Sequence, residues 1–132
     1  MCGDLILIGT YTMPIRFGTG QILEGKGEGI YALKLDRSAG RLIPEAAFKG
    51  IDNPSYLCRG ADATRLYAVN ELKEFRGEKS GALSSFRFDP DELTLELLSR
   101  HPTGGTDPCY VASGAGDSVY VANFMSGSVA VF

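Results

Sequence analysis

Apolar and polar residues alternate along many short segments of the chain, and no window shows a sustained helical period. The segment 92–100 is the best helical candidate, but Leu93, Leu95 and Leu97 alternate with polar neighbours at period two. This spacing favours a strand, because successive side chains of a strand point to opposite faces. Strand patterns cover the segments 5–12, 29–36, 42–48, 55–59, 65–71, 82–89, 94–101 and 127–132. The pattern predicts an all-β chain.

The strand segments repeat at a constant offset. Asn53-Pro54-Ser55-Tyr56-Leu57 recurs as Asp107-Pro108-Cys109-Tyr110-Val111, which is an offset of 54 residues. The segments 66–70 and 31–36 recur at 119–123 and 84–89, in both cases at an offset of 53 residues. Three separate segments that share one offset indicate a structural repeat.

Each repeat divides into four short strands that are separated by turn residues rich in Gly, Asp and Ser. Four strands at a period near 50 residues are typical of a β-propeller blade, whose faces are covered by neighbouring blades. We therefore predict the first part of one propeller domain over residues 1–132, with blade units at about 5–48, 53–101 and 107–132. These units amount to about two and a half four-stranded antiparallel blades, fewer than the roughly four to eight that close a ring. The chain enters the pattern at a second strand and leaves it within a third.

The composition is typical of a foldable domain without a large excess of positive or negative charge. Apolar residues make up 44% and charged residues 22% of the chain, and the formal net charge is −3. This balance gives no reason to expect a nucleic-acid partner, and no apolar run is long enough to cross a bilayer. The N-terminus lacks the cationic and apolar segments of a signal peptide, so we expect a cytoplasmic protein. The three cysteines form neither a disulfide framework nor a metal pair.

The order of several motifs adds a family resemblance. Leu7-Ile8-Gly9-Thr10-Tyr11-Thr12 comes first, followed by the two Pro-containing repeats, and Ala122-Asn123-Phe124-Met125-Ser126-Gly127-Ser128-Val129 comes last. In this order the motifs resemble the N-terminal third of the seven-bladed β-propeller lactonase family, which includes bacterial 6-phosphogluconolactonase. The resemblance covers essentially the whole chain.

This resemblance implies a function. It implies hydrolysis of 6-phosphogluconolactone, a sugar lactone, to the open acid in the pentose phosphate pathway. It also implies that the suspected catalytic His, Arg and Glu residues lie in later blades, beyond Phe132. The catalytic residues therefore stay unknown, and we expect the 132 residues by themselves to be inactive. We expect no cofactor and no metal, and the partners are a small sugar lactone and the remaining blades of the same ring.

Candidate binding residues follow from the usual position of small-molecule sites in propellers, at the end formed by the loops between strands two and three and between blades. Those loops are 13–28, 72–80, 102–106 and 125–126. Asn70, Glu71 and Asn123 stand at the strand ends that lead into them, and His101 lies where a fourth strand runs towards the next blade. The alternative is that these residues have no binding role: the asparagines cap turns, Glu71 is solvated and His101 is exposed. Four loop cations could meet a phosphate, although solvated charges are the commoner explanation: Arg16, Lys26, Lys73 and Arg76.

One motif matches a nucleotide-binding sequence only in part. The segment 20–26 matches GxxxxGK, the beginning of a P-loop, but Gly27 stands where Mg²⁺ binding needs Ser or Thr. A strand pattern follows it, whereas a phosphate cradle needs the N-terminus of a helix. We therefore predict a long hairpin loop here, without nucleotide binding.

Two other functions fit the same pattern. Propellers also serve as non-catalytic scaffolds for binding partners, and the fold alone does not separate the two uses. A carboxymuconate-type lactonising cyclase on the same fold is a narrower alternative that differs only in its substrate.

Overall fold

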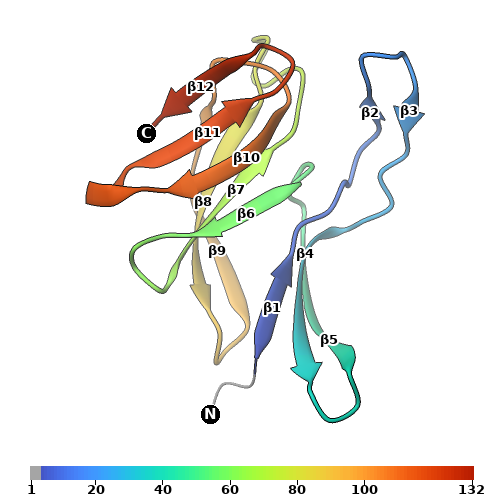
Figure 1. The fold of residues 1–132 in the computed structure, drawn as a ribbon, viewed down its shortest axis with the longest axis vertical. Coiled ribbons are helices and arrows are strands. Elements are labelled where there is room, and N and C mark those ends of the chain that lie inside the picture. Colours follow the sequence, from blue (N-terminus) through green and yellow to red (C-terminus); the bar gives the residue numbers. More distant parts are fainter. Residues whose placement is uncertain (1–3) are drawn as a thin grey trace.

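The computed structural model describes residues 4–132, and within this range the regular structure consists of strands and one short 3-10 turn at Ala115–Asp117. Three antiparallel sheets follow one another along the chain (Figure 1). The first contains β1 (Leu5–Ile8), β4 (Gly29–Asp36) and β5 (Arg41–Lys49). The second contains β6 (Tyr56–Arg59), β7 (Arg65–Asn70), β8 (Ala82–Asp89) and β9 (Thr94–Pro102). The third contains β10 (Pro108–Ser113), β11 (Val119–Asn123) and β12 (Ser128–Val131).

The prediction of an all-β chain built from four-stranded antiparallel blades is confirmed. The second sheet is a complete blade with the strand order β6-β7-β8-β9, so every strand pairs with the next strand along the chain. The segment that could have been a helix forms β9 instead. The first and third sheets show the same order with fewer strands.

A β-bulge recurs at the same place in two sheets. The register between β4 and β5 shifts between Ala32 and Leu33, and the register between β8 and β9 shifts between Ser85 and Phe86. These two positions are 53 residues apart, which is the offset of the sequence repeat. The repeat therefore reproduces the bulge of the first two sheets as well as their strands.

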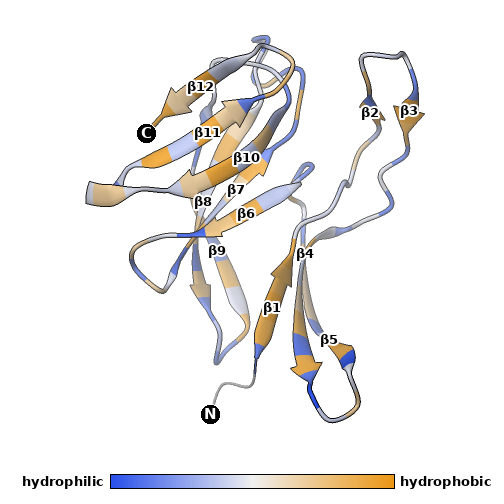
Figure 2. Ribbon diagram, viewed as in Figure 1, coloured by the Kyte–Doolittle hydropathy of each residue, from blue (hydrophilic) through white to orange (hydrophobic). Residues whose placement is uncertain are grey.

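Two apolar clusters join the three sheets. One lies between the first and second sheets and includes Ile30, Leu66 and Phe86. The other lies between the second and third sheets and includes Val69, Leu83 and Val121. Burying one such side chain contributes about 1.5–3 kcal/mol, so face-to-face packing of neighbouring sheets supplies the main stabilisation. Figure 2 shows β1 as hydrophobic along its whole length, as expected for a strand next to the first cluster.

The strand prediction for 5–12 is wrong in its second half, because β1 ends at Ile8. The amide groups of Thr12 and Met13 both donate to Oδ1 of Asn53, at 2.9 and 2.8 Å, so they do not join the ladder with β4. The other predicted strands match the structure or differ from it by one residue at one or both ends.

The long loop after β1 contains a small hairpin of its own. It consists of β2 (Ile15–Arg16) and β3 (Ile22–Leu23), and it projects beyond the sheets (Figure 1). The GxxxxGK match lies in this hairpin and is followed by β4 rather than by a helix. The sequence-based prediction that a strand follows this motif is therefore confirmed.

The loops at one end of the three sheets form what we call the loop face. It comprises residues 9–28, 50–55, 71–81, 103–107 and 124–127. The loops at the opposite end are shorter turns, such as those after β4 and β8. Across residues 4–132, the structure contains no helix with the length and hydrophobicity to span a bilayer.

Candidate functional site

The register of strand pairing shows which residues of the three sheets occupy equivalent positions. Ile8 pairs with Tyr31, and Ala68 pairs with Ser84, which is the repeat equivalent of Tyr31, so Ile8 and Ala68 are equivalent. Val121 lies at the same position of the third sheet. The position three residues further along is occupied by Tyr11, Glu71 and Phe124. Neighbouring sheets thus bring a phenol, a carboxylate and an exposed phenyl ring to one rim of the loop face.

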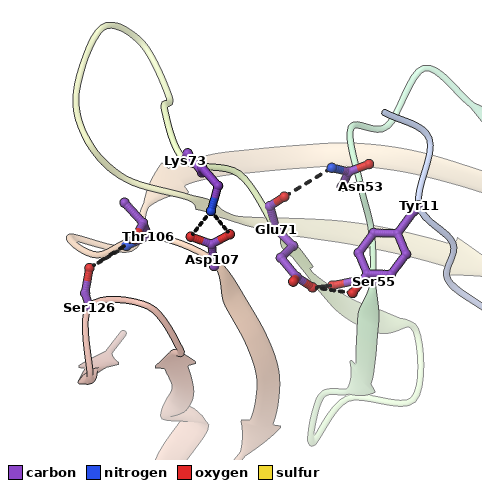
Figure 3. Close-up of polar contacts among 8 residues, drawn as sticks. All are labelled: Tyr11, Asn53, Ser55, Glu71, Lys73, Thr106, Asp107 and Ser126. Atoms are coloured by element: carbon purple, nitrogen blue, oxygen red, sulfur yellow. Dashed lines mark hydrogen bonds and ion pairs between the residues drawn. The ribbon is translucent and has the colours of Figure 1, made fainter. Parts of the chain in front are cut away.

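Glu71 is held by two hydroxyl groups, one from the loop after β1 and one from the loop before β6 (Figure 3). Ser55 Oγ donates to Oε2 of Glu71 at 2.6 Å, and Tyr11 Oη donates to the same oxygen at 3.0 Å. Within residues 4–132, no side-chain hydrogen bond reaches Oε1 and no cation pairs with the Glu71 carboxylate. Glu71 is half-buried. The carboxylate therefore has one fixed oxygen and one open oxygen, so the interpretation of Glu71 as a merely solvated side chain is wrong.

The backbone of Glu71 is fixed as well. Its N–H donates to the carbonyl oxygen of Asn53 at 3.1 Å, and its own carbonyl oxygen accepts from Nδ2 of Asn53 at 3.1 Å. Asn53 adopts φ 38°, a left-handed conformation that Asn tolerates better than most residues. The residue before the Pro of the repeat thus anchors two loops, the one after β1 and the one after β7.

The equivalent residue of the next sheet makes a charged contact in the same place. Asp107, with φ 55°, accepts from Nζ of Lys73 through both carboxylate oxygens, at 2.8 and 3.0 Å. The Asp107 side chain is 8% exposed and that of Lys73 is 46% exposed. The Lys73 charge is therefore compensated by a buried carboxylate. The sequence-based interpretation of Lys73 as a solvated loop charge is wrong.

The electrostatics of the rim keep its weak acids protonated. Burial, followed by the charge of Glu71 and the hydrogen bond to it, raises the pKa of Tyr11 to about 12. Burial, and then the Glu71 charge, also raise the pKa of the Cys109 thiol. At neutral pH, Tyr11 is thus a neutral donor to Glu71, and Cys109 is a thiol rather than the thiolate that nucleophilic attack requires.

Asn70 and Asn123 lie beneath the loop face rather than on it. Asn70 is 0% exposed, and its side chain donates to the Asp52 carbonyl oxygen at 2.7 Å and accepts from Ser84 Oγ at 2.6 Å. Asn123 is 2% exposed and donates to the Thr103 carbonyl oxygen at 3.1 Å. Both amides bridge a strand end to a neighbouring loop. Contact with a substrate stays a prediction for both residues.

One difference separates these two asparagines. Oδ1 of Asn123 is buried and has no hydrogen-bond partner among the described residues. In the second sheet the donor to the equivalent oxygen is Ser84, whereas the register places Ala130 at that position in the third sheet. The repeat therefore explains the unpaired oxygen by the loss of one hydroxyl group.

His101 lies on the outermost strand of the second sheet. It pairs with Leu83 in β9, near the loop face, and its side chain is exposed. The structure therefore places it apart from Glu71, which follows the inner strand β7. A role for His101 in substrate binding stays a prediction.

The remaining cations of the loop face are exposed. Arg16 lies in β2 and Lys26 follows β3, and the Arg76 guanidinium stacks over the Phe75 ring at 4.8 Å. No group of three or more metal-ligating residues is found between residues 4 and 132. Cys58 and Cys109 are free thiols, and Cys2 lies outside the described residues.

Sequence reasoning did not identify Tyr11 and Ser55 as the partners of Glu71. Ser55 lies within a repeat motif and Tyr11 within a motif of the family resemblance, but the contact of Tyr11 with Glu71 depends on how neighbouring sheets pack. The usable signal is the repeat itself, because aligning 9–12 with 69–72 places Tyr11 and Glu71 at the same position of successive blades.

Comparisons with known proteins agree with this architecture. Residues 5–132 match the family model described as "Lactonase, 7-bladed beta-propeller". A 6-phosphogluconolactonase candidate from Bacteroides fragilis is similar, with 34% identity, a TM-score of 0.77, and coverage of 97% of this chain and 31% of that one. One from Bacteroides uniformis shows 37% identity, a TM-score of 0.75, and coverage of 97% and 32%.

A third similar structure has a different description. It is a periplasmic gluconolactonase from Pseudomonas aeruginosa, with 34% identity, a TM-score of 0.75, and coverage of 96% of this chain and 33% of that one. This chain thus spans about a third of the length of each of these structures. No curated protein sequence matches the chain significantly.

Proposed function

Because the chain belongs to the seven-bladed β-propeller lactonase family, we propose that the whole protein hydrolyses a sugar lactone to the open acid at the loop face. The observation that supports this proposal is the Glu71 carboxylate, which Tyr11 and Ser55 hold on one oxygen while the other stays open. A polar group fixed in this way at the open end of the sheets suits a small polar ligand.

The chemistry needs more groups than these residues provide. Water adds to the lactone carbonyl carbon while a base removes its proton, and a donor or cation stabilises the oxyanion that forms. The ring C–O bond then breaks, and the leaving oxygen receives a proton. We propose that the His, Arg and Glu expected in later blades supply these steps, and that residues 1–132 alone are therefore inactive.

The proposed substrate is 6-phosphogluconolactone, which places the protein in the pentose phosphate pathway. Two of the similar structures described above are 6-phosphogluconolactonase candidates, which supports the phosphorylated substrate. The third is a gluconolactonase, so the unphosphorylated lactone is the specific competitor.

The test is an assay of the full-length protein with both lactones, corrected for the spontaneous rate of opening. Faster opening of the phosphorylated lactone supports the substrate assignment, whereas preference for gluconolactone limits the proposal to a sugar lactonase. Turnover of a carboxymuconate lactone alone indicates the cyclase. The absence of all three activities indicates a non-catalytic scaffold.

The compartment forms a separate proposal. We propose a location in the cytoplasm, whereas one similar structure is a periplasmic protein. Fractionation of cells that express the full-length protein decides between them, because release with the periplasmic extract contradicts a cytoplasmic location.

A further inference from the structure

Near Glu71, the hydrogen-bond donors of the described residues are already used, while one acceptor oxygen of the carboxylate stays open. The donors of Tyr11 and Ser55 are both used on Oε2 of Glu71. The nearby ammonium group, Lys73, is bound by both oxygens of Asp107. The open position beside Oε1 is thus next to a negative charge that no cation of the described residues compensates.

An ionised carboxylate can only accept hydrogen bonds. A ligand group at Oε1 must therefore be a donor, and a phosphate or carboxylate group is repelled there. Among the groups of a sugar lactone, only the hydroxyl groups are donors. Hydrogen bonds from hydroxyls to a charged acceptor are short and strong.

The geometry points to Glu71 as the residue that binds the hydroxyl-bearing edge of the substrate, with the anionic end of the substrate directed away from this rim. This inference rests on the proposed function and deepens it, since it assigns to these blades a specificity site rather than the groups that open the ring. Tyr11 and Ser55 act as positioning residues that fix the carboxylate.

The rigidity of the Glu71 segment supports this role. Two backbone contacts with Asn53 and two side-chain hydrogen bonds hold the residue, so little conformational entropy is lost when a ligand binds. A site built to accept hydrogen bonds from hydroxyls also rejects analogues that lack them, because its polar group is then left unpaired.

The test compares full-length wild-type protein with Glu71→Gln in steady-state kinetics on the sugar lactone that the protein turns over. We expect KM to rise about tenfold or more, as for a lost hydrogen bond to a charged group, while kcat stays within about threefold. Glu74→Gln is the matched control, because Glu74 is an exposed carboxylate on the same loop, and it leaves both constants unchanged. A collapse of kcat would make Glu71 a proton-transfer group, and an unchanged KM would remove it from the site; either result overturns the inference.

A second measurement does not depend on turnover. Saturation-transfer NMR with 1,5-anhydroglucitol, a neutral sugar ring without a lactone, should show binding to the wild type and loss of the signal in Glu71→Gln. Equal signals overturn the inference even where the lactonase assay succeeds. Binding without any lactone opening removes the proposed function and keeps the hydroxyl site.

Two further variants test the inference even if Glu71→Gln does not fold. Tyr11→Phe and Ser55→Ala keep the carboxylate and remove one positioning donor each, so each should raise KM by a smaller factor than Glu71→Gln. An unchanged KM in both variants contradicts the positioning role. Loss of all turnover in Ser55→Ala would indicate a serine nucleophile and would overturn the inference.

Discussion

The Tyr11 hydroxyl donates to Oε2 of Glu71 across the junction of the first and second sheets, at 3.0 Å. The two residues occupy the same repeat position of successive blades, so one blade supplies the donor that fixes the acceptor of the next. This contact links the stability of the blade junction to the geometry of the candidate site.

Removal of this hydroxyl should weaken the junction. Tyr11→Phe keeps the ring and loses a hydrogen bond to a charged acceptor, for which we expect a loss of about 1–2 kcal/mol in the free energy of unfolding. Urea denaturation of the full-length protein measures it. An unchanged midpoint would show that water replaces the contact without cost.

The same contact should make stability depend on alkaline pH. The pKa of Tyr11 is raised to about 12 in the folded protein, from about 10 in an unfolded chain. The protonated phenol therefore stabilises the fold fully below pH 10, and this contribution disappears as the pH rises towards 12. The free energy of unfolding should be measured for the wild type and for Tyr11→Phe between pH 9 and 12. The other tyrosines contribute equally to both proteins, so the free energy should fall more steeply with pH in the wild type. Parallel curves contradict the assignment.

Asn53 should be critical for anchoring the loops. Asn53→Ala leaves the Thr12 and Met13 amides without their acceptor. It also places at φ 38° a residue that tolerates the left-handed conformation less well than Asn, so we expect a loss of about 2–3 kcal/mol in the free energy of unfolding. Asn53→Gly is the control, because it removes the same side-chain contacts and keeps the tolerance for this conformation. A much smaller loss in Asn53→Gly than in Asn53→Ala would contradict the role given to Oδ1.

The Lys73–Asp107 pair tests the repeat position of Asn53 a second time, because Asp107 is the equivalent of Asn53 in the next sheet. Lys73→Met leaves the buried Asp107 carboxylate without its partner, and we expect a loss of about 1–2 kcal/mol, reduced from a fully buried pair because Lys73 is half exposed. The double variant with Asp107→Asn should recover part of this loss. Additive losses in a double-mutant cycle would show that the two side chains do not interact.

The unpaired oxygen of Asn123 suggests a stabilising change. Ala130→Ser restores the hydroxyl that Ser84 provides in the second sheet, and we expect a gain of about 1 kcal/mol. Thermal unfolding of the full-length protein measures it, with Ala122→Ser as a control on the neighbouring strand position. A loss of stability would mean that the oxygen already has a donor in the whole protein.

The free face of the third sheet predicts how the 132 residues behave alone. Tyr67 packs against the second apolar cluster, whereas its equivalent Tyr120 is 43% exposed beside Val129 and Val131, at 69% and 62%. Such an apolar face favours association, so we expect the isolated chain to self-associate or to be poorly soluble. Light scattering measures this, and a monomeric peak with a cooperative thermal transition contradicts it.

The sequence was sufficient for the periodic part of this fold. The strands, the four-strand unit and the loop end that carries Glu71 all follow from local alternation and from one repeated offset. The early end of β1 did not, because the Asn53 side chain, 41 residues from Thr12 and 40 from Met13, accepts hydrogen bonds from both of their amides. The partners of Glu71 were missed for the same reason, since Tyr11 meets it only when neighbouring sheets pack.

The initial rate of sugar-lactone opening by the full-length protein, followed as proton release at constant pH, tests whether the protein is a lactonase. We expect a rate well above the spontaneous one with 6-phosphogluconolactone or gluconolactone. A rate equal to that of buffer with both lactones would contradict this expectation.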